Sequence, residues 1–236
     1  MSPVLEACAI AKTFGAVQVV DGVDLQVESG ETIALVGPNG AGKTTLLNVL
    51  SGQLRATSGS IRLAGRDVTD QRPSHADRQP LLRSFQNGGA FGKLSAVDNV
   101  ALAAVVRGAP RGQAQADARA ALERVGLRPV ADWRADTLSG GQRKLIDFAR
   151  LLVTRPALAL LDEPTAGVSP AIMQTMREIL LEDRKRGLAA VIVSHDLPWV
   201  YDLCRRVVVL GDGRLLAEGT PAEVSANQTV QEAYLG

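Results

Sequence analysis

The sequence predicts an α/β fold with a mostly parallel core sheet, an antiparallel β region and a helical insert. A glycine-rich turn follows the apolar run at residues 32–36 and leads directly into a helical pattern. Farther along, short apolar runs at residues 157–161 and 189–194 alternate with helical patterns, which is typical of a parallel sheet covered by helices. With 236 residues, the chain is long enough to bury a core of its own.

The remaining elements follow from the same patterning. Further strands are expected at residues 4–12, 17–27, 60–63, 206–210 and 214–218, and helices at residues 42–50, 114–125, 141–152, 170–186 and near Trp199. Residues 211–213 read Gly-Asp-Gly, a hairpin signal. We expect a single domain over residues 1–236, with a core at 1–86 and 138–220, a helical insert at about 87–137, and a helical tail at about 221–236.

Composition and charge exclude several classes of protein. The formal net charge is +1, so the chain lacks the basic footprint of a nucleic-acid-binding protein. No apolar run approaches the ~20 residues needed to cross a bilayer, and the first residues are not typical of a signal peptide. Cys8 and Cys204 fit neither a disulfide framework nor a metal-binding spacing, which favours reduced cysteines in the cytosol.

Residues 37–44 match G-x-x-x-x-G-K-[ST], the phosphate-binding loop. Glycines let successive backbone N–H groups point at an anion, and the N-terminus of the following helix adds its own donors. Lys43 supplies a positive charge for the β- and γ-phosphates, and the Thr44 hydroxyl suits Mg²⁺. The alternative is a glycine-rich turn that happens to carry a lysine. The residues expected to contact the nucleotide are Gly37, Pro38, Asn39, Gly40, Ala41, Gly42, Lys43, Thr44 and Thr45.

Two carboxylates end the apolar strand at residues 157–161. In a parallel sheet, the carboxyl end of this strand lies beside the phosphate loop. Asp162 is then placed to bind Mg²⁺, and Glu163 to orient and polarise the water that attacks the γ-phosphate. The alternative is an acidic pair that merely opens a loop.

Residues 138–142 read Leu-Ser-Gly-Gly-Gln and precede a helix. This arrangement predicts a second anion site of the helix N-terminus type. Two such sites can serve one phosphate if two subunits pair head to tail, with Ser139 and Gly141 of one closing on ATP bound to the other. Taken alone, the segment is an ordinary helix cap.

The phosphate loop, the Leu-Ser-Gly-Gly-Gln segment and the Asp-Glu strand, in this order and over nearly the whole chain, resemble the ATP-binding subunit of an ABC transporter. The resemblance implies a P-loop NTPase fold that binds ATP and Mg²⁺, with Ser139, Gly140, Gly141 and Gln142 contacting nucleotide. It implies that Gln86 contacts Mg²⁺ or the attacking water, that His195 bonds the γ-phosphate, and that Phe14 stacks on adenine. The alternatives are a satisfied polar histidine and a core phenylalanine.

Five further segments resemble the ATPase subunits of branched-chain amino acid uptake systems, whose relatives handle urea and short amides. These segments are residues 85–87, 164–170, 206–210, 217–221 and 232–236. The chain departs from most of the superfamily at Ala166 and Ser169, where Ser and Asp are usual, and its helical insert is shorter than in one of the two ATPase types of such systems.

The resemblance also implies partners. We expect a homodimer or heterodimer of ATPase subunits at the cytoplasmic face of the inner membrane, bound to transmembrane permease subunits through a region near residues 86–93 that includes Phe91. A solute-binding protein would be an indirect partner, and nucleic acid would not be one. The rival interpretations are an exporter ATPase, a soluble ABC ATPase acting on DNA or ribosomes, and a P-loop kinase or GTPase outside the ABC family, which residues 138–142 disfavour.

Overall fold

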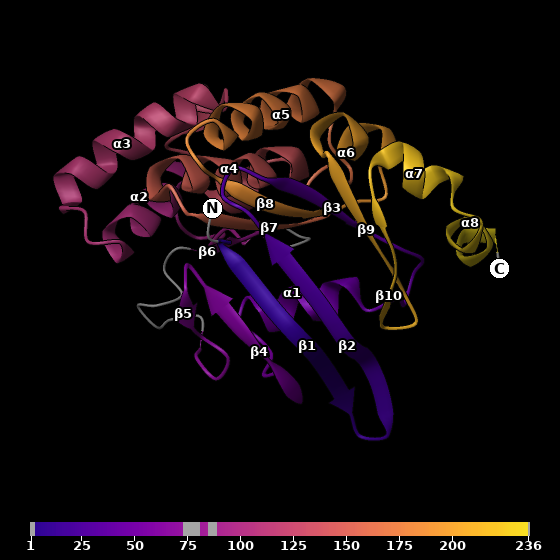
Figure 1. Cartoon of the computed structure of the whole chain (residues 1–236). Coiled ribbons are helices and arrows are strands. Elements are labelled where there is room, and N and C mark those ends of the chain that lie inside the picture. Colours follow the sequence, from indigo (N-terminus) through magenta and orange to yellow (C-terminus); the bar gives the residue numbers. More distant parts are fainter. Residues whose placement is uncertain (1–2, 73–80, 85–88, 236) are drawn as a thin grey trace. The chain divides into compact units, whose positions relative to one another are not determined.

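The computed structural model describes residues 3–72, 81–84 and 89–235 (Figure 1). The chain forms two compact units. Unit 1 comprises residues 1–83, 157–163 and 183–236, and unit 2 comprises residues 84–156 and 164–182. The domain limits expected from the sequence stay a prediction.

A six-stranded sheet forms the centre of unit 1, with the strand order β10-β9-β3-β8-β7-β6. Every neighbouring pair is parallel except β9 and β10, which form the expected hairpin. All residues of β3, β7 and β8 are buried, which explains their unbroken apolar runs. The strands are β3 (Thr32–Val36), β6 (Leu81–Arg83), β7 (Leu158–Asp162), β8 (Ala189–Val193), β9 (Arg206–Gly211) and β10 (Arg214–Gly219).

A second, antiparallel sheet of unit 1 has the strand order β2-β1-β4-β5. Its strands are β1 (Leu5–Phe14), β2 (Val17–Val27), β4 (Ser58–Leu63) and β5 (Arg66–Asp67). Helix α1 (Lys43–Leu50) contacts β1 and β2 of this sheet and β7 of the parallel sheet, and lies between the two sheets in Figure 1. One apolar core therefore connects both sheets through α1. The short strands β5 and β6 were not expected from the sequence.

Three helices complete unit 1. Helix α6 (Leu197–Leu203) contacts β3, and α7 (Pro221–Ala226) packs on the β9–β10 hairpin. The tail continues as α8 (Gln228–Leu235), so it is two helices broken at Asn227. The Asn227 side chain accepts a hydrogen bond from the Val230 N–H at 3.2 Å and caps α8.

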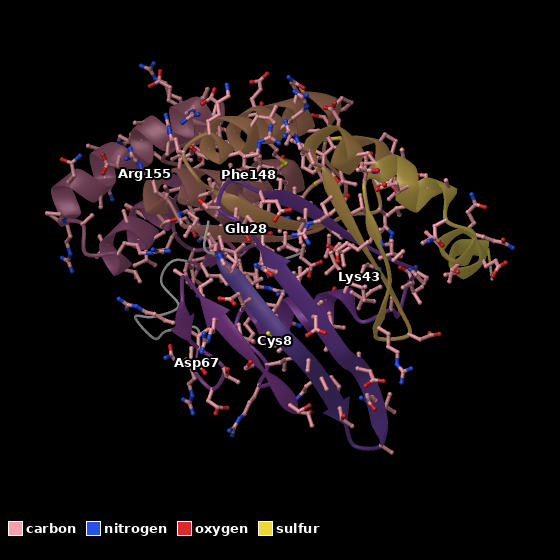
Figure 2. All side chains as sticks on the ribbon, in the orientation of Figure 1. Cys8, Glu28, Lys43, Asp67, Phe148 and Arg155 are labelled. Atoms are coloured by element: carbon pink, nitrogen blue, oxygen red, sulfur yellow. The ribbon has the colours of Figure 1, made fainter. Side chains whose placement is uncertain are left out.

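Unit 2 is helical. It contains α2 (Ala96–Val106), α3 (Arg111–Arg124), two 3₁₀ turns (Arg128–Val130 and Ala135–Thr137) and α4 (Gly140–Thr154). It also contains α5 (Pro170–Arg184) except for its last two residues. Helices α2, α3 and α4 pack on one another, and the α4 residue Phe148, labelled in Figure 2, is buried. Within the described parts of the chain, no helix is both long and apolar enough to traverse a bilayer.

Candidate active site

The glycine-rich loop joins the end of β3 to the start of α1. Gly37 has φ +150°, and a Cβ there would lie 2.1 Å from the backbone oxygen of Leu210. Gly42 caps α1 with φ +95°, and its Cβ would lie 2.6 Å from the backbone oxygen of Val19. Both distances are far below van der Waals contact, so only glycine fits at these two positions. The strand, loop and helix follow one another as the motif predicts.

The middle of the loop is open on one side. Asn39, Gly40 and Thr44 are exposed, whereas Ala41 is buried and bonded on both backbone groups. The Ala41 N–H donates to the Pro38 oxygen at 3.2 Å, and the Ala41 oxygen accepts from the Gly213 N–H at 3.2 Å. Thr45, in the first turn of α1, is half-buried. The loop is therefore held by the two backbone hydrogen bonds of Ala41, while Asn39, Gly40 and Thr44 remain accessible to solvent.

Lys43 folds back over the loop that precedes it. Its Nζ donates to the backbone oxygens of Gly37 at 2.7 Å and Pro38 at 2.8 Å, and the residue is only 8% exposed. Burial lowers the pKa of Lys43, and the nearby carboxylates of Glu163 and Asp162 oppose that shift. The ammonium group thus contacts the glycine-rich loop and lies near the carboxylates of Glu163 and Asp162.

Asp162 ends β7 in a buried position beside three polar groups. Its Oδ2 lies 3.2 Å from Arg83 Nη2, and it is hydrogen-bonded to the Thr44 side chain. Burial raises the pKa of Asp162, while Arg83, Thr44 and Lys43 act in the opposite direction. Thr44 and Asp162, the two described residues predicted to bind Mg²⁺, are therefore neighbours. Their oxygen atoms are the ligands that Mg²⁺ prefers.

Arg83 was not predicted from the sequence as part of this site. It lies on β6, next to β7, and 5% of its side chain is exposed. Burial lowers the pKa of Arg83, and Asp162 opposes the shift. The only sequence signal was an arginine ending a short apolar run just before Gln86, and the strand itself was too short to be recognised.

Glu163 and His195 come from the ends of the adjacent strands β7 and β8. His195 Nε2 lies 3.4 Å from Glu163 Oε1, and the His195 backbone N–H donates to Glu163 Oε2 at 3.3 Å. The Glu163 N–H donates to the Val193 oxygen at 2.9 Å. Glu163 is 7% exposed and has φ +49°, whereas the His195 side chain is 58% exposed. The structure therefore brings together the predicted base and the predicted γ-phosphate ligand.

Phe14 ends β1 and is 46% exposed, so it is not a core phenylalanine. The Lys12 ammonium group lies 4.9 Å from the centre of its ring. An exposed aromatic ring of this kind is free to stack on a base.

Ser139 caps helix α4 in unit 2. Its hydroxyl accepts a hydrogen bond from the Gln142 N–H at 3.2 Å, and the Gln142 side chain accepts one from the Ser139 N–H at 2.9 Å. Ser139 and Gly140 are exposed. Gly141 is buried, and a Cβ there would lie 2.8 Å from Ile172 Cδ1 of α5. The helix cap is thus observed, and its N-terminus is open to solvent.

The segment that follows Glu163 contacts helix α4. Lys144 Nζ donates to the backbone oxygen of Ala166 at 2.6 Å, and the Ile172 N–H donates to Ser169 Oγ at 3.5 Å. Ala166 and Ser169, the two departures from the superfamily, therefore lie in a segment bonded to α4 and to the start of α5. Gln86, with Phe85 and Asn87, lies outside the described residues.

Comparisons with known proteins agree with this geometry. The family model of the ABC transporter matches residues 20–166, and that of the branched-chain amino acid ATP-binding cassette transporter matches residues 214–236. The high-affinity branched-chain amino acid transport ATP-binding protein BraF of Pseudomonas aeruginosa is 34% identical over 250 positions, which cover 99% of this chain and 98% of BraF. The lipopolysaccharide export system ATP-binding protein LptB of Acidithiobacillus ferridurans is also 34% identical, over 100% of this chain and 98% of LptB.

Solved structures give the same result. A nucleotide-free ATP-binding cassette from an ABC transporter superposes with a TM-score of 0.88 at 29% identity, over 99% of both chains. The ADP conformation of MJ1267, an ATP-binding cassette of an ABC transporter, superposes with a TM-score of 0.87 at 29% identity, over 100% of both chains. The chain therefore belongs to the ATP-binding subunits of ABC transporters, a family of ATPases that drive transport.

Proposed function

We propose that this subunit powers the uptake of a small solute, a branched-chain amino acid or a short amide. The main support for this proposal is the match of residues 214–236 to the branched-chain amino acid ATP-binding cassette transporter family. These residues lie outside the nucleotide-binding motifs that all such ATPases share. BraF and LivG, both named for branched-chain amino acid transport, support the same interpretation. The equal identity to LptB keeps lipopolysaccharide export as the alternative.

In the proposed mechanism, residues 37–45 bind the phosphates of ATP and Phe14 stacks on the adenine. Lys43 would exchange its hydrogen bonds to the carbonyl oxygens of Gly37 and Pro38 for bonds to phosphate oxygens. Thr44 and Asp162 would hold Mg²⁺, with Gln86 added by the family resemblance, and the bound ion would supply positive charge to the β- and γ-phosphates. The raised pKa of the buried Asp162 supports this assignment, because a divalent cation would relieve the cost of burying its charge.

Glu163 is the proposed base for hydrolysis. Its carboxylate accepts a proton as water attacks the γ-phosphorus, and the bond between that phosphorus and the β-phosphate oxygen breaks. His195, whose ring lies beside Glu163, donates a hydrogen bond to the γ-phosphate. The two adjacent strand ends, β7 and β8, hold both groups close to where the reaction takes place.

Two subunits, identical or closely related, would together complete each nucleotide site. The N-terminus of α4, where Ser139 and Gly140 are exposed, would bind ATP held by the partner subunit, with Gly141 and Gln142 as further predicted contacts. The cap between Ser139 and Gln142 already fixes the direction of this helix end. Only the pair of subunits would then be active.

A permease is the proposed membrane partner, bound on the cytoplasmic face. Unit 2 exposes several large apolar side chains, which are Phe91, Leu94, Leu102, Val106 and Trp133. Backbone hydrogen bonds join residues 91–96 to residues 131–135, so three of these side chains come from one small region. Exposed apolar groups at this density suit a helix of a protein partner. A solute-binding protein would act through the permease.

Uptake and export are distinguished by an experiment in the organism that carries the protein. The chromosomal copy is replaced by Glu163→Gln, with the surface variant Asp132→Asn as the control, and uptake of radiolabelled leucine, urea and acetamide is measured. We expect Glu163→Gln to abolish uptake of one of these solutes. Unchanged uptake of all three, with defective lipopolysaccharide export, would reject the proposal.

A further inference from the structure

The guanidinium group of Arg150, on helix α4, is bonded on all three of its nitrogens. Nη1 donates to the Gly89 oxygen at 3.0 Å and to Asp147 Oδ1 at 2.9 Å. Nη2 donates to Asn99 Oδ1 at 2.8 Å, and Nε donates to the Asn99 backbone oxygen at 3.2 Å. Only 13% of the side chain is exposed. A planar guanidinium bonded in this way has a fixed position that an ammonium could not reproduce.

Asn99, on helix α2, extends this network to Phe91. Its Oδ1 accepts the Phe91 N–H at 2.7 Å, and its Nδ2 donates to the Phe91 oxygen at 3.0 Å. The same Nδ2 donates to the Ser95 oxygen at 2.9 Å and has a longer contact of 3.4 Å with the Leu94 oxygen. Asn99 is 1% exposed. Its amide therefore satisfies both backbone polar groups of Phe91, as a neighbouring strand would.

Phe91 itself points into solvent, although its backbone is held by buried groups. It is 57% exposed, and the Arg150 guanidinium carbon lies 6.0 Å from the centre of its ring. Because the Phe91 side chain is exposed, the buried hydrogen bonds that hold its backbone do not serve to pack it into a hydrophobic core. This arrangement is instead what a surface that must present Phe91 in a defined position requires.

Helix α4 links this network to the predicted nucleotide-contacting end. The helix begins at the Ser139 cap, and Arg150 lies eleven residues farther along. At 1.5 Å per residue the separation is about 16 Å, a length over which a helix moves as a rod. Ser139 and the backbone of Phe91 are therefore connected by one helix and two buried, mutually bonded side chains.

We infer that Arg150 and Asn99 are positioning residues that fasten residues 89–94, here called the Phe91 segment, to helix α4. When the Ser139 end of α4 is displaced, the Phe91 segment then moves together with the helix. The inference rests on the proposed function in one respect, which is that nucleotide binding displaces α4. It adds which residues transmit that displacement.

The test follows the reactivity of a cysteine at position 91 in the full chain. The parent protein carries Cys8→Ser, Phe91→Cys and Glu163→Gln, the last so that ATP is retained. The remaining cysteine, Cys204, is only 3% exposed, and burial raises the pKa of its thiol to about 12, so we expect it to react slowly. The alkylation rate of the new cysteine by a maleimide is measured with and without MgATP. ATP binding is measured separately with a fluorescent ATP analogue.

In the parent, we expect ATP to change the alkylation rate by about fivefold or more, the lower end of typical coupling between sites. Arg150→Met and Asn99→Ala should each reduce this response to less than about twofold while ATP still binds. Because the two residues act in series, the double variant should lose no more than either single variant. In the chain that keeps Phe91, hydrogen exchange of the Phe91 amide should also become about tenfold faster on Arg150→Met, although Arg150 does not touch that amide.

The control is Arg119→Met, which removes an exposed ion pair with Asp132 in the same unit and should leave the response unchanged. Arg150→Lys replaces Arg150→Met if the latter fails to fold, since it retains the charge beside Asp147 but cannot bond Gly89 and Asn99 together. A full ATP response in Asn99→Ala and in the Arg150 variant overturns the inference. So does a parent that binds ATP without any change in rate. Failure to bind ATP at all would instead refute the proposed nucleotide site.

Discussion

Glu163 has an unusual backbone conformation for its residue type. Its φ of +49° lies in the left-handed region, which costs a residue with a Cβ about 1–2 kcal/mol. The bond from its N–H to Val193 and the contact of its carboxylate with the His195 backbone N–H hold it there. Strain of this kind persists where a side chain must be aimed in one direction. We therefore expect the geometry of Glu163 to serve catalysis.

Replacing Glu163 by glutamine tests its role directly. The amide has the same shape but cannot accept a proton, so hydrolysis should fall by about 10²- to 10⁴-fold. ATP affinity should stay unchanged, because the loop residues that bind the phosphates are intact. Phosphate release and equilibrium nucleotide binding are the measurements, with the exposed Glu178→Gln as the control. Wild-type turnover in Glu163→Gln would remove this residue from catalysis.

The buried Lys43 should make stability depend on pH in the nucleotide-free protein. Burial lowers the pKa of Lys43 in the folded protein below 10.5, the ordinary value that applies to the unfolded chain. At pH values between the folded-state pKa and 10.5, the unfolded chain therefore binds more protons than the folded chain. The free energy of unfolding should therefore rise with pH across this interval. Lys43→Met should show a smaller rise, measured by chemical denaturation at pH values approaching 10.5.

The exposed Lys185→Met is the matched control for this experiment and should keep the wild-type slope. Equal slopes for wild type and Lys43→Met would contradict the buried position of the lysine. Removal of the lysine should also weaken ATP binding, which is measured at neutral pH.

Some residues of the candidate site could be predicted from local sequence patterns, and one could not. Asp162 and Glu163 were expected because two carboxylates end an apolar strand. Arg83 was not, because only the pairing of β6 with β7 brings it to Asp162. The exposure of Phe14 likewise became known only from the structure.

Helix α4 illustrates how local sequence sets an element. Its capping box between Ser139 and Gln142 follows from the order of side chains alone. Ser139→Ala should lower the free energy of unfolding by about 1 kcal/mol, because the Gln142 N–H loses the hydroxyl that accepts its hydrogen bond. Thermal unfolding of Ser139→Ala and of Ser139→Thr, which keeps the hydroxyl, provides the comparison. Equal stability of the alanine variant and wild type would contradict the observed cap.

Long apolar runs were predicted more reliably than short or interrupted elements. Strands β3, β7 and β8 are buried along their whole length, so their sequences are unbroken apolar runs that are easily recognised as strands. Strand β6 has three residues and depends on its neighbour β7. The tail was expected to be helical, but its break was overlooked. Asn227 is a common helix cap and was the available signal.

For the whole molecule, the fold class was predicted because the order of strands, loop and helices leaves few topologies for a parallel sheet. The structure confirms a mostly parallel sheet, an antiparallel sheet and a helical region. The pairing of two subunits was inferred from the second anion site at residues 138–142, with Ser139 and Gly141, and from the family resemblance. It stays a prediction, because the structure contains one chain and an exposed helix end looks the same whether water or a partner covers it.

The pairing of two subunits is tested by placing a long, charged side chain at the N-terminus of α4. In the Glu163→Gln background, Ser139→Arg should abolish ATP-dependent dimerisation, because a long side chain at an exposed helix end blocks close approach to the partner. Light scattering after size-exclusion chromatography measures the mass with and without ATP. Ser225→Arg, an exposed change of the same kind on α7, should still dimerise. Dimerisation of Ser139→Arg would show that this helix end does not face the partner subunit.

The docking of Lys43 on its own loop has a consequence for selectivity among cellular anions. An incoming ligand must replace two carbonyl bonds to a buried ammonium, each worth about 1.5–3 kcal/mol as a charged hydrogen bond. Orthophosphate and nucleoside monophosphates carry a single phosphate group, which reaches fewer of the backbone N–H groups of residues 37–45 than a polyphosphate does and so recovers less of that loss. The resting subunit should thus respond to polyphosphates in preference to such small anions.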